Sequence, residues 1–320
     1  MYEEDNKLAE ECERLAAETA VATEWLERNK ELVGRDLSGH EKELRKAGRL
    51  FRSCAVAARR KMCAGVFGPS QAGKSYLVST LAGNADRKLW TKLGDTTYDF
   101  LSAINPAGGK ESTGLVTRFT LRREGEQAPE APEGYPVHIR LLSATDIVKI
   151  LANTYFSDAE HMEAPNREAM LETLKELEKR KKGQPTGGIG PDDVEDLQEY
   201  IHKSFRSKAR VQQLLDQHFW DRVIPLAPLL GDADRAELFG IIWDSIAPFT
   251  HILRELFTAL RSLDFAAEAF CPVSALIPRE GSIIDVATLG NLAPVSDDEL
   301  ELLAIQGKKA TLPRVYVTAL

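Results

Sequence analysis

The sequence predicts an α/β fold with a phosphate-binding loop, entered through a helical hairpin and interrupted by a large helical insertion. Three observations support this prediction: a strand–loop–helix pattern from Cys63 to Gly83, two apolar helical stripes before it, and mostly helical periodicity between about residues 160 and 265. At 320 residues, of which 43% are apolar and 28% charged, the chain can bury a sizeable core.

Residues 1–60 are predicted to form the helical hairpin. Apolar residues recur at three- and four-residue steps from Leu8 to Val33 and again from Leu44 to Ala58. Gly34 and the Ser38-Gly39 pair separate the two stripes. We expect this hairpin to pack on the domain that follows, because a coiled coil with another chain would require sustained heptads.

The segment from Gly68 to Ser75 reads GPSQAGKS and matches the pattern G-x-x-x-x-G-K-[ST] at every fixed position. Gly68 and Gly73 permit backbone torsions and close approaches that a Cβ atom would block. Backbone amides of about residues 71–75 would then converge on phosphate oxygens at a helix N-terminus. Lys74 would reach the β- and γ-phosphates, and Ser75 would supply a hydroxyl to Mg²⁺.

The surroundings of this loop support the match. A strand-like run, 62–67, precedes it, an apolar helix, 76–82, follows it, and Gly83 stands where a helix C-cap is expected. The alternative is a glycine-rich strand–helix turn that holds no ligand. The residues expected to contact the nucleotide are Gly68, Ser70, Gln71, Ala72, Gly73, Lys74, Ser75 and Tyr76.

Residues 61–155 are predicted to be the first part of the α/β core. Within them, 124–136 reads as an exposed loop, 137–142 as a strand, and Ser143 to Asp146 as a capping box that opens a helix through about Tyr155. Residues 156–266 are the predicted helical insertion, in which the glycine-rich stretch 183–191 reads as a flexible break.

Residues 267–320 are predicted to return to the α/β core. Short strands are expected at 270–276 and 282–285. The chain closes on the apolar stretch 312–320, which is typical of a piece of a longer protein.

Three stretches resemble known families. The loop GPSQAGKSYLVSTLAG is similar to that of dynamin-like GTPases, and GGKESTGLVTRFTL resembles their switch I. Together, FGPSQAGKS, INPAGGKESTGLVTRFTL and SIIDVATL resemble the SrfC-like family of bacterial virulence factors over most of the chain. The resemblance implies a P-loop GTPase-like core with a helical insertion.

This resemblance also implies roles for three further residues. Thr117 would meet Mg²⁺ and the γ-phosphate as the switch I threonine, although it also suits a plain β-branched strand residue. Asp285 would hold Mg²⁺ through water, but the D-x-x-G pattern is broken because Gly290 follows two places late. Gln71, which would orient the attacking water, is displaced by one position from the dynamin glutamine.

The sequence and the resemblance together predict Mg²⁺-dependent binding of GTP or ATP and slow hydrolysis, with Lys74, Thr117 and Gln71 in catalytic roles and Ser75, Thr117 and Asp285 at the metal. GTP is favoured by the resemblance alone, since no N/T-K-x-D motif occurs before Leu320; Thr91 to Gly94 comes closest. The alternative is an interaction protein of an effector assembly, in which the nucleotide site is degenerate and the hairpin and insertion bind protein partners.

Charge and segment composition argue against several other classes of protein. The net charge of −8 argues against a basic nucleic-acid groove. The acidic N-terminus does not resemble a signal peptide, no stretch reads as a membrane span, and we expect no membrane contact. Together with the resemblance, this implies a bacterial cytoplasmic protein or a delivered effector. The cysteines Cys12, Cys54, Cys63 and Cys271 have no zinc-site spacing and are expected to be reduced and buried.

Overall fold

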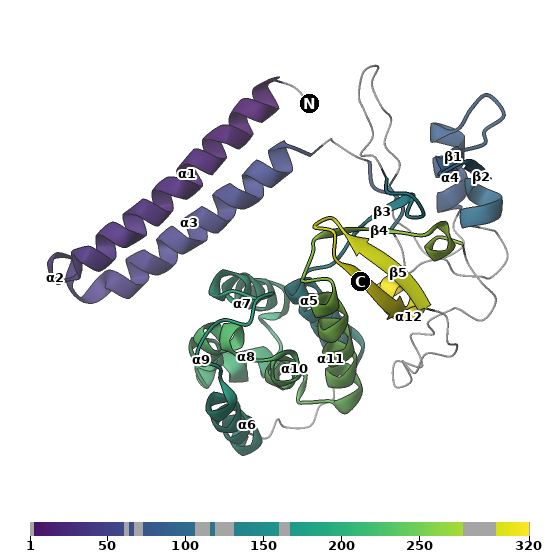
Figure 1. The fold of residues 1–320 in the computed structure, drawn as a ribbon. Coiled ribbons are helices and arrows are strands. Elements are labelled where there is room, and N and C mark those ends of the chain that lie inside the picture. The colour runs from purple at the N-terminus through teal and green to yellow at the C-terminus, as the bar shows by residue number, and fades with distance from the viewer. Residues whose placement is uncertain are drawn as a thin grey trace. The chain divides into compact units, whose positions relative to one another are not determined.

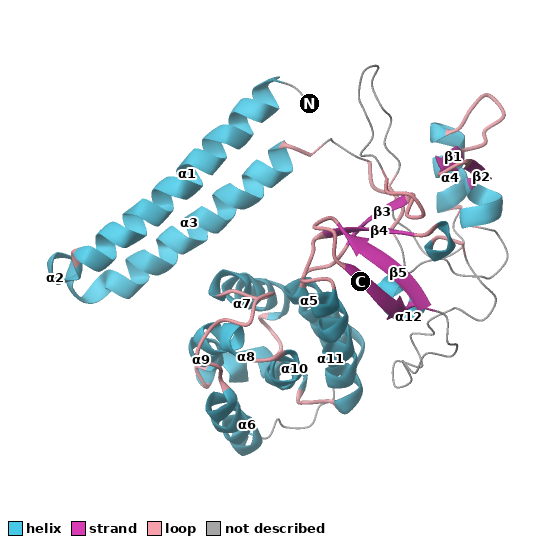
Figure 2. Cartoon of the chain, in the orientation of Figure 1, coloured by secondary structure: helices cyan, strands magenta, loops and turns pink. Residues whose placement is uncertain are grey.

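The computed structural model describes residues 3–60, 64–66, 73–105, 116–118, 131–159, 167–277 and 299–319. These residues are mainly helical and contain two small antiparallel sheets (Figures 1 and 2). The chain divides into two compact units, Met1–Val66 and Phe67–Leu320.

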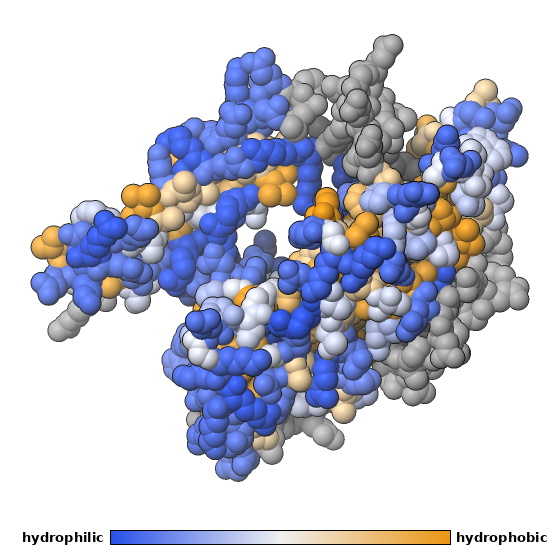
Figure 3. All heavy atoms as spheres, viewed as in Figure 1, coloured by the Kyte–Doolittle hydropathy of each residue, from blue (hydrophilic) through white to orange (hydrophobic). Residues whose placement is uncertain are grey.

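The first unit is a helical hairpin, as the apolar stripes predict. Helix α1 (Glu3–Arg28) and helix α3 (Leu37–Ala58) run side by side, joined by α2 (Lys30–Val33) and the 3₁₀ turn η1 (Gly34–Asp36) (Figure 1). Gly34 ends α2 with a φ of +75°, which glycine adopts without strain. Figure 3 shows apolar residues along the hairpin between hydrophilic ones.

Residues 73–105 form a compact element, here called the small lobe. Helix α4 (Lys74–Ala82) leads to the β-hairpin of β1 (Trp90–Leu93) and β2 (Thr96–Asp99), which continues into the π-helical turn η2 (Phe100–Ile104). Leu89, Phe100 and Ile104 are the buried centre of this lobe. The predicted helix after the loop is confirmed, whereas the sequence did not predict the β-hairpin.

The second sheet is antiparallel with the strand order β3–β4–β5–β6. Its strands are β3 (Val137–Arg140), β4 (Glu268–Cys271), β5 (Glu299–Ala304) and β6 (Lys309–Pro313), and helix α12 (Arg314–Ala319) follows β6. One face of the sheet is buried, with side chains from Ala269, Cys271, Leu300, Leu302 and Leu312. The strand predicted at 137–142 is confirmed over Val137–Arg140.

Among the described residues between the strands β3 and β4, seven helices form what we call the helical body, residues 144–266. They are α5 (Ala144–Thr154), α6 (Arg167–Arg180), α7 (Pro191–Phe205), α8 (Ala209–Asp216), α9 (Phe219–Leu226), α10 (Asp232–Gly240) and α11 (Ala247–Ser262). The short turns η3 (Tyr155–Ala159), η4 (Ala227–Leu229) and η5 (Ile241–Trp243) connect some of them.

Local signals in the helical body agree with the sequence. The capping box is present: the Asp146 amide donates to Ser143 Oγ at 3.1 Å, and the Ser143 amide donates to the Asp146 carboxylate at 3.2 Å. The apolar stripe of α11 is buried at Leu253, Leu256 and Leu260. Both features depend on neighbours within two helical turns, which is why the sequence predicts them.

The segment before α7 that was predicted to be a flexible break is instead held by hydrogen bonds from two arginine side chains. Arg235 is fully buried, and its guanidinium donates to the carbonyl oxygens of Gly187 at 2.7 Å and of Ala227 at 2.8 Å. Arg261 donates to the carbonyl oxygen of Thr186 at 3.0 Å. These donors lie 48 and 75 residues away in sequence, so local composition could not reveal them.

Other expectations for the α/β core need correction. Of the strand predicted at 62–67, the described residues, Ala64 to Val66, are irregular and exposed, and Ala64 and Gly65 offer little side chain to bury; residues 62, 63 and 67 lie outside the described residues. The strand predicted at 270–276 ends at Cys271, since Pro272 lacks an amide and the 3₁₀ turn η6 (Val273–Ala275) follows. The described residues do not show a P-loop core, and the strand predicted at 282–285 lies outside them.

The expectation of buried cysteines holds for only two of the three described. Cys12 and Cys271 are buried, and burial raises the pKa of the Cys271 thiol to about 12. Cys54 is exposed, which corrects the prediction. Cys63 lies outside the described residues.

Candidate functional site

The second half of the predicted phosphate loop lies at the start of α4. Gly73 is the N-cap residue and has a left-handed backbone, with φ +81° and ψ 13°. Apart from its immediate chain neighbours, no described residue has an atom within 4 Å of the place where a Cβ atom would be, so the requirement for glycine here comes from the backbone conformation. Lys74 and Ser75 are the first two residues of the helix and are half-buried.

The first turn of α4 is an ordinary helix N-terminus. The Leu77 amide donates to the Gly73 carbonyl at 2.9 Å, which closes the first turn. The amides before it have no partner within the helix, as at every helix N-terminus, and they carry the positive end of the helix dipole. A phosphate oxygen placed at this turn would satisfy these amides.

Ser75 is positioned by a residue that the sequence did not single out. The Asn105 side-chain amide donates a hydrogen bond to Ser75 Oγ. Asn105 caps η2, and its own amide donates to the Phe100 carbonyl at 2.8 Å. The available signal was the Asn105–Pro106 dipeptide, which marks a turn but does not indicate a contact thirty residues away.

The turn after α4 fixes the far end of the helix. Ser79 is fully buried and its hydroxyl donates to the Arg87 carbonyl at 3.1 Å. Asn84 Oδ1 accepts hydrogen bonds from the amides of Asp86 and Lys88, each at 3.1 Å. Gly83 ends the helix as predicted, although in an extended conformation, and the Lys88 backbone passes 2.8 Å from the position of an added Cβ atom.

Other predicted site residues are only partly described. Tyr76 is exposed on α4, and Thr117 lies in the short irregular segment 116–118, where it is also exposed. The structure brings together Gly73, Lys74 and Ser75, and it adds Asn105 to them. The remaining predicted residues lie outside the described residues; these are Gly68, Ser70, Gln71, Ala72 and Asp285.

The possible metal ligands in this region can be compared with those that the predicted Mg²⁺ would require. Magnesium ions prefer oxygen ligands, and Ser75 Oγ is an oxygen that keeps an acceptor site beside its hydrogen bond from Asn105. Ser75 therefore fits one position of such a site, and Mg²⁺ would there offset phosphate charge. Within the described ranges, no group of three or more His, Cys, Asp or Glu side chains could hold a metal ion.

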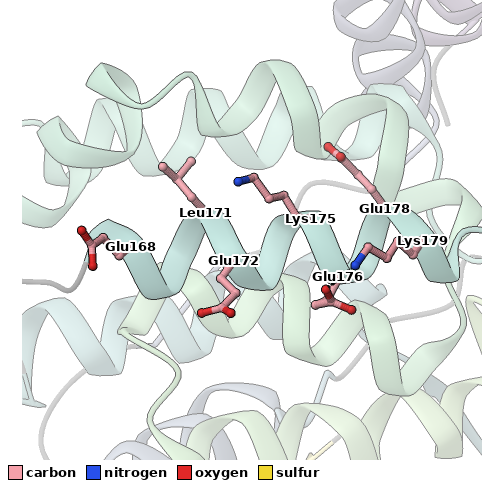
Figure 4. Close-up of a pocket in the computed structure, with 7 residues that line it drawn as sticks. All are labelled: Glu168, Leu171, Glu172, Lys175, Glu176, Glu178 and Lys179. Atoms are coloured by element: carbon pink, nitrogen blue, oxygen red, sulfur yellow. Dashed lines mark hydrogen bonds and ion pairs between the residues drawn. The ribbon is translucent and has the colours of Figure 1, made fainter.

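A surface depression of about 640 Å³ lies along α6, away from these residues in sequence. Figure 4 shows that its lining side chains project from opposite sides of this one helix, so they do not converge on a ligand. Two of its carboxylates already have partners: Glu176 pairs with Lys179 at 2.6 Å, and Glu178 with Arg222 at 2.7 Å. We assign it no function.

The described residues define a mainly helical protein with two small antiparallel sheets. They include the last three residues of the phosphate-loop sequence motif, Gly73 to Ser75. No described helix has the length and apolar character needed to cross a membrane. Residues 22–320 match the model of a family described as "Putative bacterial virulence factor". Because the match covers most of the chain, the chain belongs to this family. No curated protein and no solved structure matches the chain.

Proposed function

We propose that the chain binds a nucleoside triphosphate with Mg²⁺ at residues 68–75 and hydrolyses it slowly. The observation that carries this proposal is the coincidence of motif and geometry: the glycine before the motif lysine is a left-handed N-cap, and Lys74 and Ser75 begin the helix. In this proposal, the amides of the first turn and the Lys74 ammonium bind the phosphates, and Ser75 Oγ contacts Mg²⁺.

The proposed hydrolysis is an in-line attack by water on the γ-phosphate. Lys74 and Mg²⁺ would offset the charge that develops in the transition state, while Thr117 and Gln71 would position Mg²⁺ and the attacking water. Asp285 would hold Mg²⁺ through water. Membership of a virulence-factor family supports a role for this activity in a bacterial effector, with GTP as the favoured nucleotide and ATP as the alternative.

Titration of a fluorescent, slowly hydrolysed GTP analogue with Mg²⁺ tests the binding step. Lys74→Ala is expected to weaken binding by at least tenfold, since it removes a charged contact to the phosphates. Lys88→Ala is the matched control, because Lys88 belongs to the same lobe and lies over the Trp90 ring instead. Equal affinity of wild type and Lys74→Ala would refute the proposal.

The second candidate function is an interaction protein whose nucleotide site does not hydrolyse. The broken D-x-x-G pattern after Asp285 favours it. Phosphate release above the level of a Ser75→Ala variant would support the enzyme, and nucleotide binding without release would support the interaction protein. Competition between GTP and ATP for the same site separates the two nucleotides.

A further inference from the structure

The hydrogen bond between Asn105 and Ser75 joins two elements of the small lobe. The side-chain amide of Asn105, which caps η2, donates to Ser75 Oγ in the first turn of α4. The backbone amide of Asn105 donates to the Phe100 carbonyl oxygen at 2.8 Å, and this bond fixes Asn105 at the end of η2. The side chain therefore reaches Ser75 from a position that the turn itself determines.

Both elements pack on the buried centre of the lobe. Phe100 and Ile104 of η2 belong to this centre, and Val78 of α4 packs against it. In addition, the buried Ser79 hydroxyl holds α4 through its hydrogen bond to the Arg87 carbonyl oxygen. Because packing and hydrogen bonds hold α4 and η2 together, the Asn105 side chain is already in place at the Ser75 hydroxyl before a ligand binds.

This hydrogen bond restricts what the Ser75 hydroxyl can do. A serine hydroxyl has one hydrogen to donate and two lone pairs that accept. Asn105 occupies one lone pair of Ser75 Oγ, which leaves the other lone pair and the O–H hydrogen. A magnesium ion takes an oxygen lone pair, whereas an anionic phosphate oxygen accepts the hydrogen. All three positions of the hydroxyl would then be used.

We propose that Asn105 is a positioning residue for the Mg²⁺ that accompanies the nucleotide, an inference that rests on the function proposed above. Asn105 holds Ser75 Oγ so that its remaining lone pair is presented to the metal and its hydrogen to a phosphate oxygen. Ser75 contacts the metal, and Asn105 acts through Ser75. Groups that orient a metal ligand in this way typically change metal affinity by about 10–100-fold.

The same hydrogen bond could instead serve only to stabilise the lobe, and the two roles predict different results. A purely stabilising bond acts whether or not Mg²⁺ is present, so its loss would weaken nucleotide binding equally in both conditions. A positioning role requires the metal, so its loss would weaken binding in Mg²⁺ and leave binding without Mg²⁺ unchanged.

Titration of a fluorescent, slowly hydrolysed GTP analogue in excess Mg²⁺, and again in EDTA, separates these roles. For Asn105→Ala, we expect the affinity in Mg²⁺ to fall about tenfold and the affinity in EDTA to stay within about twofold of wild type. Ser102→Ala is the matched control, because its hydroxyl donates to Asp99 within η2, and it should match wild type in both conditions. Equal losses for Asn105→Ala in Mg²⁺ and in EDTA would overturn the proposal.

The Ser75→Ala background tests whether Asn105 acts through Ser75. Ser75→Ala removes the hydroxyl that Asn105 orients, so adding Asn105→Ala should cause no further loss of affinity in Mg²⁺. A further loss of about tenfold in the double variant would overturn the proposal, because Asn105 would then act without Ser75. Circular dichroism checks that each variant keeps its helices.

The wild-type titrations distinguish failure of this inference from failure of the proposed function. If Mg²⁺ tightens binding by the same factor in wild type and in Asn105→Ala, the proposed function stands and the role of Asn105 is overturned. A wild-type chain that binds no nucleotide, or binds it equally well with and without Mg²⁺, would overturn the proposed Mg²⁺ site and the role of Asn105 with it.

Discussion

The helical body and the small lobe differ in how their polar groups are hydrogen-bonded and in how far their apolar side chains are buried. In the helical body the guanidinium of Arg235 is buried and donates to three carbonyl oxygens, and large side chains such as Trp243 and Phe219 are fully enclosed. The small lobe encloses three large apolar residues, while Leu77 and Leu81 on α4 remain exposed. The helical body, which shares one buried core with the four-stranded sheet, is therefore stabilised by contacts within the chain, whereas a ligand or partner can change the stability of the lobe most.

The largest effect is expected from Arg235→Met in the helical body. It leaves the buried carbonyl oxygens of Gly187, Ala227 and Pro228 without their donors, and each unsatisfied group costs about 1–3 kcal/mol. We expect the free energy of unfolding to fall by about 4 kcal/mol, measured by urea denaturation. A loss below about 1 kcal/mol would mean that Arg235 does not hold this loop.

Two adjacent glycines of the same loop provide a matched pair. Gly187 and Gly188 both have φ +79°, but only Gly188 faces Phe265, whose ring lies 2.5 Å from an added Cβ atom. Gly187→Ala should cost about 1 kcal/mol of stability for backbone strain alone, and Gly188→Ala about 3 kcal/mol, because the ring must also move. Equal losses in thermal denaturation would contradict the packing described for this loop.

In the small lobe, Gly83→Ala should lower the stability by about 2 kcal/mol. The loss cannot exceed the free energy needed to unfold the lobe by itself. The added methyl group would meet the Ser79 carbonyl oxygen and the Lys88 backbone. Hydrogen exchange should speed up in residues 74–104 and stay unchanged in the helical body. Faster exchange in both regions would show that the lobe does not unfold separately.

The smallest effect is expected from Asn105→Ala, at about 1 kcal/mol for one hydrogen bond to Ser75. Because this bond joins η2 to α4, exchange at the first turn of α4 should rise more than elsewhere in the lobe. Ser102→Ala is the control, since its hydroxyl donates to Asp99 within the same turn, at 3.1 Å. Identical exchange in both variants would argue that Asn105 does not position α4.

The sequence predicted those features whose causes are local. The capping box at Ser143 and Asp146, the hairpin stripes, and the start of a helix directly after Gly73 follow from spacings of a few residues. The sequence did not predict features that depend on residues far apart in the chain. The glycine-rich loop is held by Arg235 and Arg261, and Ser75 meets Asn105 from thirty residues away.

The core strand predicted at 62–67 and the β-hairpin that was not predicted show a second limit of prediction from the sequence. Ala64 and Gly65 have the composition of a close-packed strand, yet they carry too little apolar surface to guarantee burial. The β-hairpin alternates weakly, and its main signal was the turn at Gly94, with φ +62°. Of the candidate site, the sequence predicted the glycine, lysine and serine that begin α4, and the structure added Asn105.

Hydrogen exchange of the α4 amides with and without a slowly hydrolysed GTP analogue and Mg²⁺ tests the central claim most directly. If phosphate oxygens accept hydrogen bonds from the first turn, exchange at residues 73–76 should slow at least tenfold in wild type and remain fast in Lys74→Ala. Unchanged exchange at these amides, at nucleotide concentrations that saturate the Lys88→Ala control, would contradict phosphate binding at this turn.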